Sequence, residues 1–96
     1  MRRTIDRIRE KVRSGQYGLT FHAIEEMAEE AFEEEDFEQA MITGRIVRRQ
    51  TDRLGRRKYT VEGLARDERS LRAVCRFSDS GAYLVVITIY DATEGA

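Results

Sequence analysis

The sequence has no proline and no tryptophan, and it has only one cysteine and one histidine among its 96 residues. With Cys75 alone, neither a disulfide framework nor a cysteine-based zinc site can form within one chain. His22 alone adds too few ligands for a His/Cys metal cluster. We therefore expect no metal and no cofactor.

Long apolar segments are also missing. The longest apolar run, residues 83–87, is far too short to span a bilayer. The basic N-terminal segment lacks the apolar region of a secretory signal. We therefore expect a cytoplasmic protein with no membrane partner.

Charged residues make up 36% of the chain and are strongly segregated, although the formal net charge is −1. Residues 1–14 carry six basic and two acidic side chains, whereas residues 15–44 carry nine acidic and no basic ones. Residues 45–76 carry eleven basic and four acidic side chains, and residues 77–96 carry three acidic ones. This pattern favours binding of a polyanion on one side of the protein, through residues 45–76.

The length fits one domain with a single modest core, and the apolar residues are periodic, which argues against disorder. Apolar residues at helical spacing predict helices over about residues 4–14, 21–31 and 34–43. Residues 16–19 are expected to form a short extended link. The predicted inward stripe of the second helix consists of Ile24, Met27, Ala28 and Ala31.

After Gly44 the apolar period changes from 3.6 to 2, which indicates strands. We expect strands that open at Ile46 and Val47 and that cover residues 56–64, 71–77 and 83–90, followed by a frayed tail over residues 92–96. The last strand is apolar on both faces, so it should be central and covered by a helix. The sequence thus predicts an α+β fold, with two or three N-terminal helices packed on one face of a four-stranded antiparallel sheet.

Five short motifs occur in an order that is known from one family. They are the segment Leu19-Thr20-Phe21-His22-Ala23-Ile24-Glu25-Glu26-Met27 with its His-Ala-x-x-x-Met core, acidic residues 33–36 before Phe37, Gly44 before Ile46-Val47, Gly55-Arg56-Arg57-Lys58-Tyr59, and residues 85–90. Over residues 17–91 the chain resembles an uncharacterised branch of the RelE/BrnT-like toxin superfamily. Many members carry an arginine shortly after the methionine, and residues 28–32 have none.

The resemblance implies one RelE/BrnT-like domain over residues 1–96, with its core at about 17–91. It also implies a toxin role in a toxin–antitoxin pair, as an mRNA endoribonuclease or RNA-binding domain. In such folds basic and polar side chains on the sheet grip RNA and help the ribose 2′-hydroxyl attack the adjacent phosphate. The expected partners are RNA and a small antitoxin protein, and a homodimer is left open.

Candidate site residues follow from this chemistry. The candidate catalytic residues are His22, Arg57, Tyr59, Arg76 and Tyr90, and the candidate RNA-binding residues are Arg45, Arg48, Arg56, Arg57, Lys58 and Arg72. Unperturbed histidine can exchange a proton near neutrality, arginine matches phosphate oxygens with two donors, and tyrosine stacks on bases. Strand alternation is expected to send Arg57 and Tyr59 to one face, and Arg56 and Lys58 to the other.

Each candidate also has a purely structural interpretation. His22 can pack on the sheet and bond Glu26 one turn on, and the run around Arg57 can be a solvated hairpin. The strand arginines, Arg49 included, form a basic sheet face if all point away from the helices, or else they protect sheet edges by charge. Tyr90 is expected on one face with Thr88, Leu84 and Val86, where a structural role is favoured. Cys75 is expected in the core, and the glutamates of residues 25–38 on a solvated face.

A second hypothesis is a non-catalytic protein-interaction module of the same fold. The direction of four arginines separates the two hypotheses. Convergence of Arg45, Arg57, Arg72 and Arg76 on one face favours nucleic acid. Their dispersal over both faces favours the module.

Overall fold

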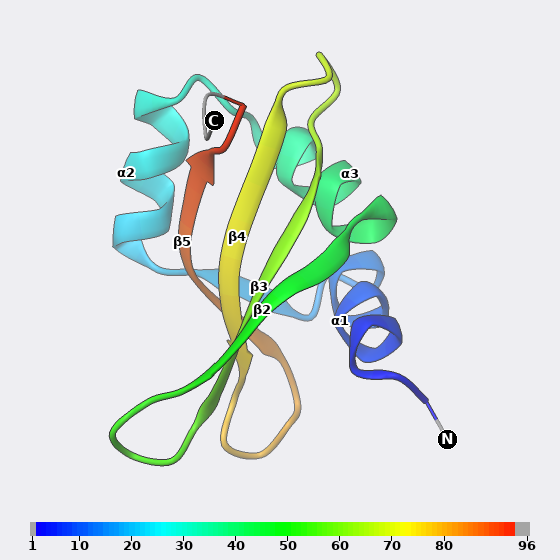
Figure 1. Cartoon of the computed structure of the whole chain (residues 1–96), viewed down its shortest axis with the longest axis vertical. Helices are drawn as coiled ribbons and strands as arrows, with labels where there is room; N and C mark the ends of the chain where they lie inside the picture. The colour runs from blue at the N-terminus through cyan, green and yellow to red at the C-terminus, as the bar shows by residue number, and fades with distance from the viewer. Residues whose placement is uncertain (1, 94–96) are drawn as a thin grey trace.

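Three helices precede most of a five-stranded mixed sheet in the computed structural model, which describes residues 2–93 (Figure 1). The helices are α1 (Thr4–Arg13), α2 (Phe21–Glu29) and α3 (Glu34–Thr43). The strands are β1 (Tyr17–Leu19), β2 (Arg45–Thr51), β3 (Arg57–Leu64), β4 (Ser70–Phe77) and β5 (Leu84–Asp91). The strand order is β1-β5-β4-β3-β2. The predicted tail beyond Thr93 lies outside the described residues.

The predicted α+β class is confirmed, but the predicted sheet of four antiparallel strands is wrong in detail. The segment expected to be a link forms β1, which runs parallel to β5 and pairs residues 17–19 with residues 84–86. Backbone hydrogen bonds extend this pairing on both sides, from Leu84 N to Gln16 O (2.9 Å) and from Thr20 N to Val86 O (3.0 Å). β5 is therefore an inner strand, as its apolar composition indicated.

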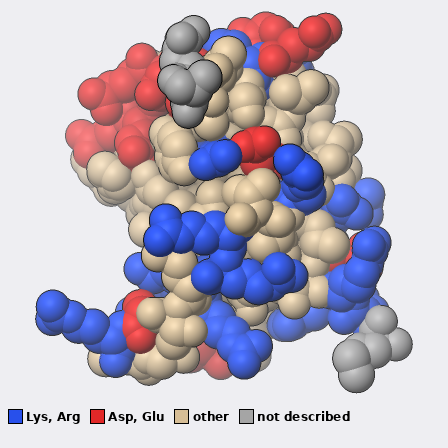
Figure 2. All heavy atoms as spheres, viewed as in Figure 1, with Lys and Arg blue, Asp and Glu red and all other residues tan. Residues whose placement is uncertain are grey.

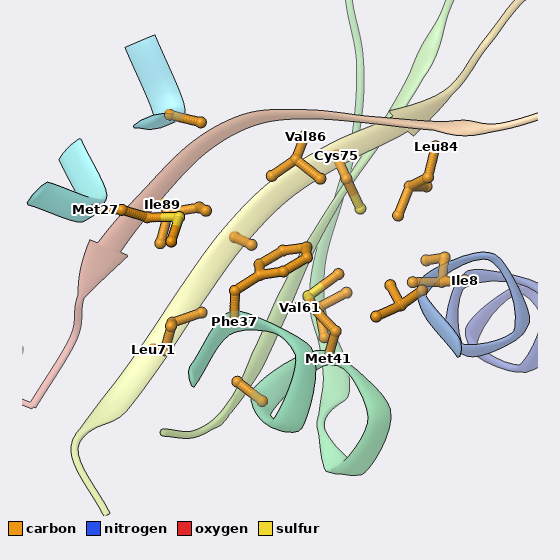
Figure 3. Packing of buried hydrophobic residues seen from close by; sticks show 14 of the residues in the cluster. Ile8, Met27, Phe37, Met41, Val61, Leu71, Cys75, Leu84, Val86 and Ile89 are labelled. Carbon is orange, nitrogen blue, oxygen red and sulfur yellow. The ribbon is translucent and has the colours of Figure 1, made fainter. Parts of the chain in front are cut away.

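The helices build the core against one face of this sheet. α3 packs on β3 and β4, α1 packs against α3 and the start of β5, and α2 lies along β5 and β1 (Figure 1). Figure 3 shows Phe37 and Met41 of α3 among side chains from the sheet, with Ile8 of α1 and Met27 of α2 on either side. Cys75 is fully buried in this cluster, which confirms its predicted core position.

α3 and β3 approach each other so closely that only glycine fits between them. A Cβ at Gly63 would lie 2.0 Å from the backbone oxygen of Ala40, and one at Gly44 would lie 2.4 Å from the same oxygen. The missing side chains let the α3 backbone rest directly on β3. This contact fixes which face of β3 is turned toward the helices.

The predicted inward stripe of α2 is largely wrong. Of its four residues only Met27 is buried, while Ile24, Ala28 and Ala31 are exposed. The other buried residue of α2 is Ala23, which lay outside the predicted stripe. The reason is that α2 lies along β5 instead of crossing the middle of the sheet (Figure 1). The helix also ends earlier than predicted, and Ala31 has a left-handed φ of 56°.

Two irregularities interrupt the strand alternation. In β2, Ile46 pairs with Val61 but Arg48 pairs with Thr60, so Val47 is an extra residue. In β5, Val86 pairs with Cys75 but Thr88 pairs with Val74, so Ile87 is extra. Such bulges change the face on which the following side chains lie.

The bulge in β5 overturns one expectation. Thr88 and Tyr90 pair with Val74 and Arg72 on the face away from the helices. Leu84 and Val86, which were expected on the same face as Thr88 and Tyr90, are fully buried under the helices.

Candidate nucleic-acid interface

The sheet face away from the helices carries rows of polar and basic side chains. Residues paired across neighbouring strands project on the same side of a sheet. One row therefore contains Tyr90, Arg72, Glu62 and Arg45, and a second contains Thr88, Val74, Thr60 and Arg48. Arg76, opposite Val85, and Lys58, opposite Gln50, lie on the same side. We call this surface the open face.

Three cations of the open face are free of ion pairs. Arg45, Arg48 and Lys58 make no salt bridge within residues 2–93. Arg72 is paired, since its Nε donates to Oε2 of Glu62 at 2.7 Å. Glu62, and to a smaller extent Tyr90, raises the pKa of Arg72.

Arg76 is held more loosely. Its Nη1 lies 4.0 Å from a carboxylate oxygen of Asp79, which is almost fully exposed, and donates to the backbone oxygen of Phe77 at 3.2 Å. In Figure 2, which looks onto this side, basic side chains gather over the middle and lower part, and acidic ones gather at the upper left, where α2 lies. The predicted separation of charge is thus visible on the surface.

His22 lies at the β5 edge of the open face. Its Nε2 is 3.2 Å from Oε1 of Glu26, which confirms the predicted contact one turn along the helix. The same oxygen accepts the backbone N–H of Ile89 at 3.0 Å and the hydroxyl of Thr88. Glu26 thereby satisfies the edge of β5 beyond the end of β1 and links the largely exposed His22 ring to Thr88, which lies on the open face.

Arg57 and Tyr59 face the other way, toward the helix side of the sheet. They pair with Thr51 and Arg49 of β2, and all four residues line a pocket with Thr4 and Gln50. Tyr59 is buried, and its ring packs edge-on against Phe77 with centroids 6.2 Å apart. The predicted split between Lys58 and the pair Arg57 and Tyr59 is confirmed.

Arg49 joins this pocket and not the basic sheet face on which it was considered with Arg45 and Arg48. The bulge at Val47 is what turns Arg49 toward Tyr59, opposite to its neighbour Arg48. Predicting this pairing would require the register of the β2–β3 hairpin, and the sequence does not indicate where a bulge shifts that register.

Arg56 acts within its own turn. Its Nε donates to Asp52 at 3.1 Å, and Asp52 also accepts the backbone N–H groups of Leu54 and Arg56 at 2.9 Å each. The backbone N–H of Arg56 is the main cause of a lowered pKa at Asp52. Arg56 is thus engaged in bracing the β2–β3 hairpin.

The structure therefore brings together only part of the predicted site. Arg45, Arg72 and Arg76 converge on the open face, but Arg57 does not. Among the catalytic candidates, Arg76 and Tyr90 share the open face, His22 borders it, and Arg57 and Tyr59 lie on the opposite side. Across residues 2–93, no three His, Cys, Asp or Glu side chains are arranged to hold a metal ion.

None of the helices described is long and apolar enough to cross a membrane. The chain belongs to the family described as "Domain of unknown function (DUF4258)", which matches residues 19–91. Searches of curated proteins and of solved structures found no significant match. The matched region runs from the last residue of β1 to the last residue of β5, and so it includes the whole open face.

Proposed function

We propose that this member of the DUF4258 family is a toxin-like domain that binds single-stranded RNA on its open face. The supporting observation is that Arg45, Arg48 and Lys58, which make no salt bridge within residues 2–93, share one helix-free surface. Phosphate contacts supply most of the affinity of such interfaces, and free cations make them without first breaking an ion pair. The resemblance to RelE/BrnT-like toxins implies the same ligand.

The open face also offers contacts beyond simple charge. Its first row crosses four strands, which is about 14 Å from β2 to β5, and so accommodates several nucleotides. Tyr90 ends this row beside Arg72, and in this proposal its ring stacks on a base. Glu62 within the row disfavours a phosphate at that one position and directs the backbone toward Arg45 and Arg48.

The proposal extends to RNA cleavage. His22 borders the open face and takes the proton of a ribose 2′-hydroxyl, while Arg76 stabilises charge on the phosphate. The 2′-oxygen attacks phosphorus and the bond to the 5′-oxygen breaks, which leaves a 2′,3′-cyclic phosphate and a 5′-hydroxyl that takes a proton from water. No nucleophilic side chain is needed. A regulatory partner, as the resemblance implies, would silence the domain by covering this face.

Fluorescence anisotropy with a labelled 20-nucleotide RNA at several salt concentrations tests binding. Replacing Arg45, Arg48 and Lys58 together with Gln should weaken binding at least tenfold and lower the salt slope by about 2, since each single-strand phosphate contact contributes about 0.7. The matched control replaces Arg2, Arg3 and Arg13 of the α1 region, which are exposed and distant from the open face. An equal loss in the control, or no wild-type binding at low salt, would refute an open-face interface.

Cleavage has its own test. Induced expression should slow growth, and mapped RNA 5′ ends should carry hydroxyl groups. A 2′-deoxy substitution at a mapped site should block cleavage while leaving binding intact, and His22→Ala should slow cleavage without changing affinity. If RNA binds to the protein but is never cleaved, the binding function stands and the ribonuclease function is refuted.

A second candidate, the protein-interaction module, is favoured by one observation: of the four arginines expected to converge, Arg57 does not join Arg45, Arg72 and Arg76 on the open face. A module of this kind would bind an acidic protein surface on the open face. This module would be favoured if the protein does not bind RNA and if its induced expression does not slow growth.

A further inference from the structure

α2 carries an apolar stripe that the chain itself leaves uncovered. Phe21, Ile24 and Ala28 stand at i, i+3 and i+7, which places them on one side of the helix. Phe21 is 77% exposed and Ile24 is 51% exposed, while Ala23 and Met27 take the buried positions beneath β5. α2 therefore has two apolar sides, and only one of them has a partner in this fold.

The uncovered side opens into a groove. Apolar side chains from β1, α2 and the segment before α3 line it, namely Leu19, Ile24, Met27, Ala28 and Phe32. Met27 and Phe32 are largely buried and form its floor. Glu33, Glu34 and Glu35 at the start of α3 form its rim, and all three are exposed.

The rim is strongly acidic. No basic residue occurs between residues 15 and 44, so β1, α2 and α3 carry no lysine or arginine, and the guanidinium of Arg69 before β4 lies 4.1 Å from the centroid of the Phe32 ring. Glu33 is paired with Arg66 and Glu34 accepts the hydroxyl of Tyr17, but Glu25, Glu29 and Glu35 make no salt bridge in the described part of the chain.

We propose that this groove is a docking site for a basic amphipathic helix of a partner protein. Apolar side chains at helical spacing would fill the groove between Ile24 and Phe32, and Lys or Arg on the flanks would meet Glu29 and Glu35. The apolar contact supplies affinity, and the charges set orientation and partner choice.

Charge complementarity selects this occupant over the alternatives. A two-fold dimer would place the groove against its own copy and bring two glutamate rims together. Nucleic acid is repelled by the same rim. The docking site is thus separate from the open face, and peptide docking can be tested independently of RNA binding.

The test uses a labelled 18-residue peptide made only of Leu and Lys, with Leu at helical spacing, and a scrambled peptide of equal composition. The full chain should bind the ordered peptide at least tenfold more tightly than the scrambled one. Ile24→Glu should weaken binding at least tenfold, even though it adds a negative charge that would strengthen nonspecific attraction of Lys. The matched control is Leu54→Glu, which makes the same change at an exposed apolar side chain of the β2–β3 hairpin.

The outcomes separate clearly, provided that circular dichroism shows both variants folded. Weaker binding of Ile24→Glu with unchanged Leu54→Glu supports docking in the groove. Equal affinity for ordered and scrambled peptides, or unchanged binding by Ile24→Glu, would overturn it. A wild-type dimer in light scattering that Ile24→Glu turns into a monomer would assign the groove to a second copy and also overturn the proposal.

Discussion

At the scale of single residues, Asp36 has a role that its sequence pattern only partly indicates. The pattern placed a carboxylate at a helix start, where the helix dipole favours it. In the structure Asp36 is 5% exposed, and one of its oxygens accepts the backbone N–H of Glu33 at 2.8 Å. The other accepts the backbone N–H of Arg66 at 3.1 Å and its Nε at 2.9 Å. Asp36 therefore ties the start of α3 to the β3–β4 loop.

These contacts make stability depend on pH. Arg66, more than the backbone donors, lowers the pKa of Asp36 to about 2. The unfolded chain binds the proton near pH 4, so stability from this group is complete above that pH and is lost as the pH falls toward 2. We expect Asp36→Asn to lower the free energy of unfolding by about 2 kcal/mol at pH 7. In urea titrations, the gap between wild type and variant should close between pH 4 and pH 2.

The control for this prediction is Glu35→Gln, the neighbouring exposed carboxylate in the first turn of α3. It should change the free energy of unfolding by less than about 0.5 kcal/mol. A gap between wild type and Asp36→Asn that stays constant from pH 7 to pH 2 would show that the Asp36 charge is not what stabilises the fold.

Local contacts were predictable at this scale, and distant ones were not. The contact of His22 with Glu26 follows from helical spacing alone, so the sequence predicted it. The contacts of Glu26 with Thr88 and Ile89 join residues more than sixty positions apart, and nothing in the local pattern indicates them. The position of Cys75 in the core could be predicted because its strand alternates regularly.

At the scale of elements, the strand that was missed is the short one. β1 has only three residues, which is too few for an alternating pattern, and its partner is the last strand of the chain. β1 forms by pairing with the edge of β5 that β4 leaves open. The four longer strands, the three helices and their order were predictable from period and length.

The bulges limited the prediction of the site in the same way. A single extra residue at Val47 sends Arg48 to the open face and Arg49 to the helix side. The extra residue at Ile87 moves Tyr90 onto the open face beside Arg72. Sequence therefore indicated which segment is basic, but the register decides which of its arginines act together.

The contact between α3 and β3 gives a prediction for this scale. Gly63→Ala places a Cβ 2.0 Å from the backbone oxygen of Ala40, and a backbone cannot yield as a flexible side chain does. We expect the free energy of unfolding to fall by about 3 kcal/mol, measured by urea denaturation followed by circular dichroism. The helix would have to lift from the sheet to relieve the clash.

Gly18→Ala is the matched control, because it also lies in a strand but has no atom within 4 Å of the added Cβ. Its effect should stay within about 0.5 kcal/mol. Equal effects of the two substitutions would mean that the loss reflects glycine replacement in strands and not the approach of α3.

At the scale of the whole molecule, the charge segregation in the sequence becomes a separation of surfaces. Basic residues 45–76 contain three of the four strands that bear the open face, and acidic residues 25–38 lie in α2 and at the start of α3. A polyanion approaching this protein is attracted by one side and repelled by the other, which orients the encounter. The charge counts predicted this polarity, although they could not locate the groove on the acidic side.

The last prediction concerns the extent of the folding unit. The family match begins at residue 19, yet Ile8 and Val12 of α1 are 0% and 2% exposed in the same core as β5 (Figure 3). Burying two such side chains contributes about 3–6 kcal/mol, which is a large share of the roughly 5–15 kcal/mol that stabilises a typical domain. A chain lacking residues 1–14 should therefore show no cooperative urea transition and should lose RNA binding.

Point variants in α1 test the same contribution to the free energy of unfolding with smaller changes. Ile8→Ala should lower the free energy of unfolding by about 3 kcal/mol, through lost burial and the cavity left behind, while Arg13→Ala on the exposed side of α1 should change little. Cooperative unfolding of the shortened chain with wild-type stability would show that α1 is an accessory to the sheet. The expected result instead makes α1 part of the structure that holds β5, and through β5 holds Tyr90 on the open face.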